Sequence, residues 1–138
     1  MNYTETLQYL YNRTPAFHLI GAGAYKPGLE RSHALDDAMD RPSHAFHVIH
    51  IARTNGKGSV SHMLAAILQA DGHRVGLYTS PHLVDYRERI RVNGQMIPKD
   101  EVVRFVEENR ELIEQQNPSF FEVTTAMAFD YFRRQKVE

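Results

Sequence analysis

The stretch Thr54-Asn55-Gly56-Lys57-Gly58-Ser59 lies between a short apolar run, residues 46–52, and a segment with helically spaced apolar residues, 58–70. The apolar run is rich in β-branched residues and bounded by turn-forming ones, which predicts a strand buried on both faces, as in a parallel sheet. The two glycines of the stretch let successive backbone N–H groups point at one anion, and the helix that follows adds its positive amino-terminal end. We therefore predict a phosphate-binding loop in which Lys57 reaches the β- and γ-phosphates and Ser59 offers its hydroxyl to phosphate or Mg²⁺.

This loop does not meet the strict pattern G-x-x-x-x-G-K-[ST], because residue 51 is an isoleucine and Gly58 separates Lys57 from Ser59. A simple glycine-rich turn between a strand and a helix is the alternative interpretation. The strand before the loop, the lysine within it and the helix after it together favour phosphate binding.

The rest of the chain predicts an α/β fold with a mostly parallel sheet and flanking helices. Residues 75–79 form a second apolar run, so strand, loop, helix and strand make a βαβ unit with a right-handed crossover. The Asn93-Gly94 pair between two short apolar runs predicts a β-hairpin. Apolar spacing predicts helices over residues 2–12, 29–39, 58–70, 98–116 and 120–134. The third of these helices is expected to turn five apolar side chains inward: Val60, Met63, Leu64, Ile67 and Leu68.

Residues 133–138 leave the last helix and resemble the beginning of a further strand. Only two buried strands precede them, which is few for a doubly wound sheet. We therefore expect an incomplete ATPase domain.

The composition indicates one ordinary globular domain of 138 residues, with 42% hydrophobic and 24% charged residues. The formal net charge of −1 argues against a general nucleic-acid surface or a membrane-seeking patch. The chain contains no cysteine, which excludes disulfides and thiolate metal sites. It shows neither a signal-peptide pattern nor the roughly 20 apolar residues that cross a bilayer, so we expect a cytoplasmic protein.

Residues 50–60 resemble the H-V-A-G-T-N-G-K-G-S-V loop of folylpolyglutamate synthases and dihydrofolate synthases, which belong with the Mur ligases. Further segments match the family in the same order: 28–31, 76–83 with 85–94, and 120–122 with Thr125. The resemblance implies a P-loop NTPase-like fold that uses ATP and Mg²⁺, with K⁺ as a further candidate cation. It also implies a two-step ligation in which ATP phosphorylates the carboxylate of dihydropteroate or a reduced folate and L-glutamate displaces the phosphate. The implied partners are therefore small molecules, not nucleic acid or membrane, and the full-length protein is expected to be a monomer.

Carried over position by position, the resemblance implies that residues 54–59 cradle the ATP phosphates and that Lys57 and Ser80 are catalytic, with Ser80 as a Mg²⁺ ligand. Residues 81–89 match a mobile loop between the ATP and folate sites. Glu122 is expected to accept hydrogen bonds from the pterin amino group, and nearby rings to stack on the pterin. The residues implied to contact this substrate are Ala24, Tyr25, Lys26, Pro27, His82, Ser119, Phe120, Phe121 and Glu122. A turn-forming Ser-Pro remains the alternative for Ser80, and a place in the helix core remains the alternative for either phenylalanine.

Two departures from the family pattern bear on activity. Arg53 stands where the family loop has glycine, and we expect weaker ATP binding as a result. The family also continues past residue 138 with an acidic Mg²⁺ ligand, a metal-binding histidine, a modified lysine and a glutamate-binding domain. We therefore expect the chain to be an amino-terminal part that is inactive alone. A fragment of a Mur-type cell-wall ligase and a non-catalytic nucleotide- or folate-binding domain remain alternatives.

Overall fold

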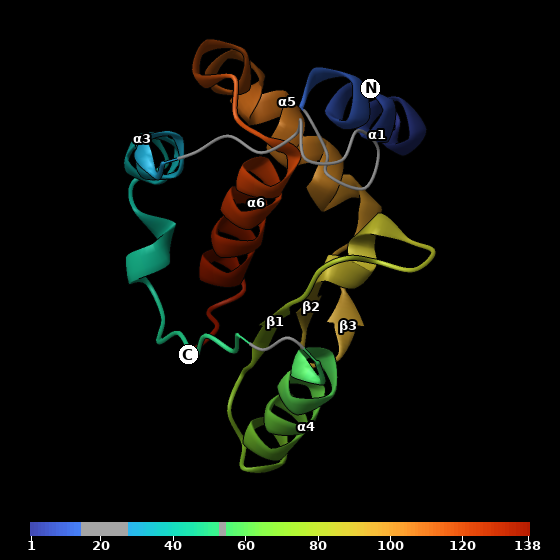
Figure 1. Ribbon diagram of the computed structural model, residues 1–138, viewed down its shortest axis with the longest axis vertical. Helices are drawn as coiled ribbons and strands as arrows, with labels where there is room; N and C mark the ends of the chain where they lie inside the picture. Colours follow the sequence, from blue (N-terminus) through green and yellow to red (C-terminus); the bar gives the residue numbers. More distant parts are fainter. Residues whose placement is uncertain (15–27, 53–54) are drawn as a thin grey trace.

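The computed structural model describes residues 1–14, 28–52 and 55–138, and Figure 1 shows the arrangement of its elements. The elements follow one another as α1 (Tyr3–Arg13), α3 (Glu30–Ala38), the 3₁₀ helix η2 (Pro42–His44), α4 (Lys57–Ala70), β1 (Gly76–Tyr78), the 3₁₀ helix η3 (Tyr86–Arg89), β2 (Ile90–Val92), β3 (Gln95–Met96), α5 (Lys99–Gln116) and α6 (Phe120–Arg134). All five predicted α-helices and the predicted strand at 75–79 are confirmed, with ends that differ by at most one residue.

Helix α6 is the centre of the packing. The Ser119 hydroxyl accepts a hydrogen bond from the Glu122 N–H, and the Glu122 carboxylate accepts one from the Ser119 N–H, so a capping box begins the helix. Its apolar residues are buried on more than one side, including Val123 and Met127, each 1% exposed. The helix contacts η2, α3, α5 and β1, and Figure 1 shows it running between α3 and the sheet.

The described sheet has three strands in the order β1-β2-β3, and both pairs are antiparallel. The hairpin at Asn93 and Gly94 is confirmed: both residues have left-handed backbones, with φ of 49° and 81°, as the tight turn requires. The expected mostly parallel sheet is not what the described residues form. Residues 46–52 were predicted as its first strand, but the structure has no strand there.

The physical reason lies in strand pairing. A strand buried on both faces needs neighbours along its edges, and the described hydrogen bonds give residues 46–52 only one backbone contact, from His47 N–H to the Glu138 carbonyl at 2.9 Å. Val48 and Ile49, expected to be buried, are 59% and 63% exposed.

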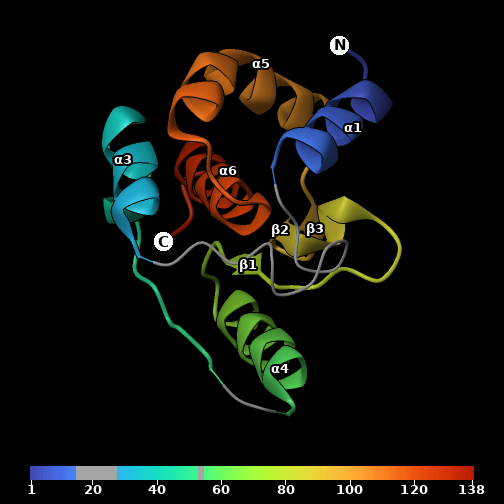
Figure 2. The same ribbon diagram turned by 45° about the horizontal axis from the view of Figure 1, so that its top comes forward.

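Helix α4 also differs from its expected packing. It lies against β1, apart from the other helices (Figure 2). None of its residues is buried, so the expectation of five inward side chains is wrong. Val60, Leu64 and Leu68 are half-buried, whereas Met63 and Ile67 are 59% and 65% exposed.

The core lies where α1, α5 and α6 meet the sheet, around fully buried side chains such as Leu10, Ile90, Val106 and Ile113. Within the described ranges, no helix combines the length and apolarity that crossing a bilayer requires.

Candidate functional site

The predicted phosphate loop is described from Asn55 onward, while Arg53 and Thr54 lie outside the described residues. Gly56 adopts a left-handed backbone, with φ 75° and ψ 6°, and directly precedes α4. No side chain caps the first turn of this helix, and Lys57, Gly58 and Ser59 are exposed. A Cβ added at Gly58 would meet no heavy atom within 4 Å. The geometry therefore suits an anion at the positive end of the helix, where backbone N–H groups face solvent.

Ser80 follows β1 and is half-buried. The peptide bond between Ser80 and Pro81 is cis. Among the described residues, no hydrogen bond or ion pair joins Ser80 to residues 55–59, so its role as a Mg²⁺ ligand stays a prediction. The described histidine and carboxylate side chains likewise form no cluster of three that would hold a metal ion.

One carboxylate organises residues 80–89. Glu88 accepts hydrogen bonds from the backbone N–H groups of Leu83, Val84 and Asp85 at 2.9, 3.1 and 2.7 Å. These donors, that of Asp85 foremost, hold the pKa of Glu88 below its usual value. The same contacts leave the side chains of Leu83 and Val84 pointing outward, 92% and 90% exposed.

His82, predicted to contact substrate, is engaged on both ring nitrogens. Arg89 Nε donates to His82 Nδ1 at 2.7 Å, and the Tyr11 hydroxyl lies 3.5 Å from His82 Nε2. Because a guanidinium only donates, Nδ1 is the acceptor and a neutral ring carries its hydrogen on Nε2. Arg89 is only 4% exposed and its guanidinium lies 5.2 Å from the centre of the Phe120 ring. Sequence analysis did not single out Arg89, because no local pattern in the chain shows that its side chain is buried.

The two phenylalanines at the start of α6 have separate roles. Phe120 is 3% exposed and stacks on Tyr11 with ring centres 5.3 Å apart, so it belongs to the core. Phe121 is 55% exposed and lies 5.9 Å from the ring of Tyr78, tilted by 33°. Of the pair, Phe121 is therefore the ring that a flat ligand can reach. Burial raises the pKa of Tyr78 to about 12, and its hydroxyl hydrogen-bonds to Thr125 at 2.9 Å.

Glu122, in the first turn of α6, forms an ion pair with Arg31. Both of its carboxylate oxygens accept from Arg31 Nε, at 3.1 Å each, and one of them also accepts from the Ser119 N–H at 3.2 Å. Its side chain is 10% exposed. Arg31 was not predicted as a site residue, and no spacing in the sequence links it to a residue 91 positions later.

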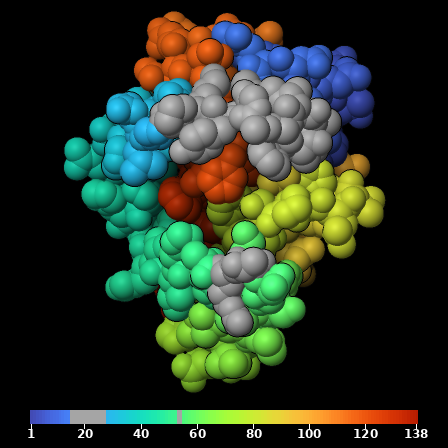
Figure 3. All heavy atoms as spheres, viewed as in Figure 1, coloured from blue at the N-terminus to red at the C-terminus, as the bar shows by residue number. Residues whose placement is uncertain are grey.

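The structure thus places Ser119, Phe121 and Glu122 at the start of α6, and His82 is linked to the same turn through Arg89, whose guanidinium lies over the Phe120 ring. In Figure 3 this helix, in orange-red, lies at the floor of a hollow between the blue-to-teal surface of α3 with residues 42–52 and the yellow surface of residues 80–95. The predicted contacts at Ala24, Tyr25, Lys26 and Pro27 lie outside the described residues.

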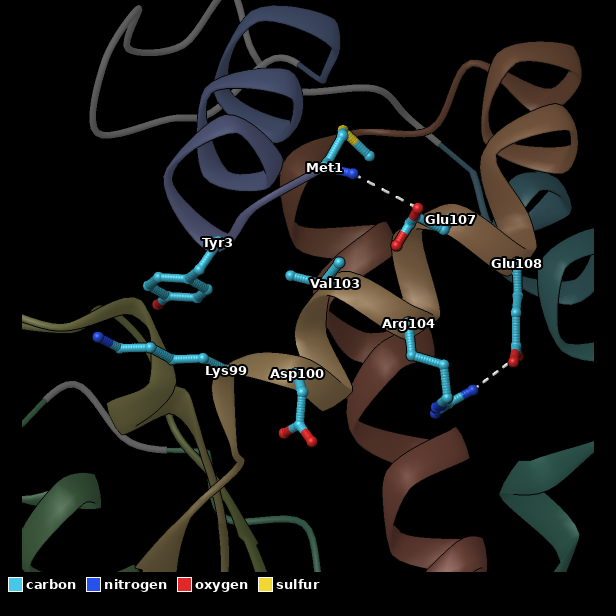
Figure 4. A pocket seen from close by; sticks show the side chains of 8 residues that line it. All are labelled: Met1, Tyr3, Lys99, Asp100, Val103, Arg104, Glu107 and Glu108. Atoms are coloured by element: carbon cyan, nitrogen blue, oxygen red, sulfur yellow. Dashed lines mark hydrogen bonds and ion pairs between the residues drawn. The ribbon is translucent and has the colours of Figure 1, made fainter.

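A separate shallow pocket lies between α1 and the first half of α5 (Figure 4), lined by Met1, Tyr3, Lys99, Asp100, Val103, Arg104, Glu107 and Glu108. One ion pair spans it from the terminal amine to Glu107, at 3.5 Å, and another runs along α5 from Arg104 to Glu108, at 2.7 Å. None of the predicted site residues lines this pocket, so we do not assign the site to it.

Comparison with known proteins gives a consistent result. No protein-family model matches the chain. The folylpolyglutamate synthase of Lacticaseibacillus casei is 37% identical over 145 residues, which cover 100% of this chain and 32% of that protein. A probable bifunctional folylpolyglutamate synthase/dihydropteroate synthase of Haloferax volcanii is 36% identical over 100% of this chain and 16% of that protein.

Solved structures agree with these sequences. The crystal structure of folylpolyglutamate synthase from Thermotoga maritima matches 98% of this chain and 31% of its own, with 43% identity and a TM-score of 0.85. An FPGS–AMPPCP–folate complex matches 99% of this chain and 33% of its own, with 34% identity and a TM-score of 0.84. The chain matches these solved relatives over all but a few of its own residues and spans about a third of their length. It belongs to the folylpolyglutamate synthase and dihydrofolate synthase family.

Proposed function

We propose that this chain carries the ATP- and folate-contacting part of a cytoplasmic ligase that adds L-glutamate to dihydropteroate or a reduced folate. The observation that carries the proposal is the left-handed Gly56 at the uncapped start of α4. It stands in a chain that matches an FPGS structure in complex with AMPPCP and folate over 99% of its length. The folate branch is preferred to a cell-wall ligase because the relatives are folylpolyglutamate and dihydrofolate synthases.

The proposed nucleotide site uses the loop and the helix end together. Backbone N–H groups of residues 54–59 hold the phosphates, and Lys57 reaches the terminal phosphates with its ammonium group. Mg²⁺, and K⁺ where the reaction uses it, would be held partly by Ser80 through its hydroxyl. A bound metal would neutralise charge on the transferred phosphoryl group.

The proposed substrate site lies around the first turn of α6. Phe121 offers an exposed ring for stacking on a pteridine, and Glu122 offers carboxylate oxygens to its amino group. Arg31 fixes the Glu122 carboxylate by donating to both oxygens. His82 would contact the substrate from the neighbouring loop, with its ring held by Arg89. Residues 24–27 complete the set in this proposal.

Catalysis in this proposal comes from positioning and charge. A carboxylate becomes reactive toward an amine only after its oxygen is converted to a leaving group, which the acyl phosphate supplies. The chain would contribute the amino-terminal part of an ATPase domain whose sheet is mostly parallel when complete. Binding of glutamate would fall to a second domain, so we propose that the 138 residues bind nucleotide and do not complete ligation.

The test is a calorimetric titration of the 138-residue chain with Mg-ATP. Lys57 and Lys99 are the first residues of α4 and α5, so they form a matched pair of helix-start lysines. Lys57→Ala is expected to weaken binding about tenfold or more, roughly 1.4 kcal/mol, whereas Lys99→Ala leaves it within about twofold. Equal affinities for both variants would contradict the nucleotide site.

Two further measurements test the effect of Arg53 on nucleotide binding and the proposal that the chain does not complete ligation. Arg53→Gly is expected to tighten Mg-ATP binding, because a glycine at this position admits the phosphates more closely. A radiolabelled-glutamate assay of the unmodified chain is expected to show no product, and detection of glutamate ligation would overturn the assignment of glutamate binding to another domain.

A further inference from the structure

The guanidinium of Arg89 is buried beside an imidazole and an aromatic ring. This residue ends η3, and only 4% of its surface is exposed. Its Nε donates to Nδ1 of His82 at 2.7 Å, and its guanidinium carbon lies 5.2 Å from the centre of the Phe120 ring. Within residues 1–14, 28–52 and 55–138, its two Nη atoms form no hydrogen bond or ion pair. The N–H donors on both Nη atoms are therefore unused in these ranges.

The acidic side chains of the neighbouring segments have other partners. Asp85 accepts from Arg87 Nη2 at 2.9 Å. Glu88 accepts from three backbone N–H groups of its own loop. Glu122 forms its ion pair with an arginine of α3. No carboxylate of η3, of the loop before it or of the first turn of α6 therefore compensates the buried guanidinium.

A buried cation in this position calls for an anion. An arginine side chain keeps its proton in proteins, and burying an ionised group without an opposite charge is costly. The Phe120 ring offsets part of that cost, but it supplies no negative charge. Across the described part of the chain, every fully buried side-chain nitrogen or oxygen has a hydrogen-bond partner. The unbonded Nη atoms of Arg89 are therefore not sealed off, and they retain contact with solvent.

We propose that Arg89 binds the carboxylate of an arylcarboxylate ligand through its two Nη atoms. A guanidinium presents parallel N–H groups that match the two oxygens of a carboxylate. His82 holds the Nε edge and Phe120 lies against the guanidinium, so the donors are oriented before the ligand arrives. The identity of the ligand rests on the proposed function, because dihydropteroate ends in a 4-aminobenzoate group.

The surroundings favour an aromatic carboxylate over an amino acid. Phe120 stacks on Tyr11 with ring centres 5.3 Å apart and meets Tyr86 edge-on at 5.6 Å, so the guanidinium lies against an aromatic wall. An amino acid would bring its own ammonium group beside Arg89, where the neighbouring carboxylates are already paired. A carboxylate on an aromatic ring carries no such positive charge and avoids the repulsion.

The first test is an NMR titration of the 138-residue chain with sodium benzoate. We expect saturable shifts of the Arg89 side-chain N–H signals, while those of Arg91 stay unchanged. Arg91 is the control because it lies two positions further along, on β2, and its more exposed side chain likewise forms no hydrogen bond or ion pair within the described ranges. Unchanged Arg89 signals would overturn the proposal. Tighter binding of inorganic phosphate than of benzoate would overturn the choice of a carboxylate.

A matched pair of substitutions separates binding from folding. Arg89→Met keeps a long unbranched side chain and removes the charge, so benzoate affinity is expected to fall about tenfold or more, whereas Arg91→Met leaves it within about twofold. Without benzoate, Arg89→Met is expected to keep or raise the melting temperature, because an uncompensated buried charge is removed. A lowered melting temperature with unchanged benzoate affinity would show a structural arginine and overturn the proposal. If Arg89→Met does not fold, the titration of the unmodified chain decides.

Three natural ligands establish which carboxylate is bound. Arg89→Met is expected to weaken binding of dihydropteroate about tenfold or more and to leave hydroxymethyl-dihydropterin, which lacks the benzoate, within about twofold. Equal losses for both ligands, or stronger Arg89 shifts with L-glutamate than with benzoate, would overturn the proposal. A chain that binds benzoate at Arg89 but no dihydropteroate would contradict the proposed function and leave the arylcarboxylate site in place. The two proposals therefore fail separately.

Discussion

Arg31 donates from its Nε to both carboxylate oxygens of Glu122, at 3.1 Å each, across 91 positions of sequence. This pair ties α3 to the first turn of α6, in which the preceding residue, Phe121, has an exposed ring. The same carboxylate closes the capping box of α6, so one side chain serves both the helix start and the proposed substrate site.

Replacing Glu122 with glutamine is therefore expected to lower the free energy of unfolding by about 1–3 kcal/mol, because a charge-assisted bond to a mostly buried acceptor is lost. Glu114→Gln is the control, since its pairing with Arg110 is exposed, and about 0.5 kcal/mol or less is expected there. Urea unfolding followed by circular dichroism measures both. Similar losses in the two variants would show that the Arg31 contact adds no stability.

Gly58 offers a way to separate stability from nucleotide binding. A Cβ at this position would meet no atom, and alanine is favoured over glycine inside a helix by roughly 0.5–1 kcal/mol. Gly58→Ala should therefore raise the melting temperature while weakening Mg-ATP binding, because the methyl group stands where phosphate approaches the backbone. Thermal unfolding and calorimetry check the two halves, and unchanged affinity would place the phosphates elsewhere.

Substitution of Gly76 by alanine is expected to lower the stability of the fold, in contrast to the same substitution at Gly58. Its added Cβ would lie 2.8 Å from Cδ1 and Cε1 of Phe132, so β1 and α6 approach too closely for a methyl group. Gly76→Ala should cost about 1–3 kcal/mol of unfolding free energy. The double variant with Phe132→Leu, which removes ring atoms, is expected to recover part of the loss. A double variant less stable than the sum of both changes would refute the steric explanation.

The loop of residues 80–89 is expected to loosen in acid. The pKa of Glu88 is lowered by backbone N–H donors, chiefly that of Asp85, so its stabilising effect is present above the ordinary value of 4.5. That effect is lost as pH falls through the lower folded-state pKa. An NMR titration of the Leu83, Val84 and Asp85 amides should show a shared midpoint below 4.5. The midpoint should vanish in Glu88→Gln, and a midpoint above 4.5 would contradict the assignment.

Among the charged residues of the core, Asp130 is expected to lower the free energy of unfolding most when it is substituted. Its side chain is 6% exposed and accepts from Arg104, Arg133 and Arg134 at 3.1, 2.9 and 3.1 Å. Asp130→Asn should cost roughly 3 kcal/mol, because the arginines then face an amide hydrogen in place of a charge. Urea unfolding of Asp130→Asn beside Glu108→Gln, whose carboxylate is 53% exposed, measures the difference. A larger loss at Glu108 would disprove the ranking.

The sequence patterns correctly predicted those elements whose structure depends on interactions between residues close in the chain. Helices α5 and α6 carry their apolar spacing, acidic first turns and, for α6, a capping residue within their own sequence. The Asn93-Gly94 turn likewise contains all that its left-handed backbone needs. Such elements were predictable within one residue because their hydrogen bonds close within the element or with its immediate neighbour.

The rest depends on contacts that no single segment encodes. Residues 46–52 have the composition of a buried strand, but a strand exists only where another pairs with it. Phe120 and Phe121 are adjacent and chemically identical, so only the rotation of α6 in the fold decides which ring is buried. The burial of Arg89 could not be predicted for a similar reason, since the sequence does not reveal that its guanidinium contacts His82 and Phe120.

The central place of α6 has a consequence for how the protein is made. Elements α3, η2, β1 and α5 all pack on it, yet residues 120–134 are translated after every one of them. During translation, the apolar sides of these four segments are therefore exposed until α6, on which they all pack, leaves the ribosome. The core can therefore complete its packing only after α6 is translated, and a chaperone that shields α5 and β1 until then is expected to raise the yield of native protein.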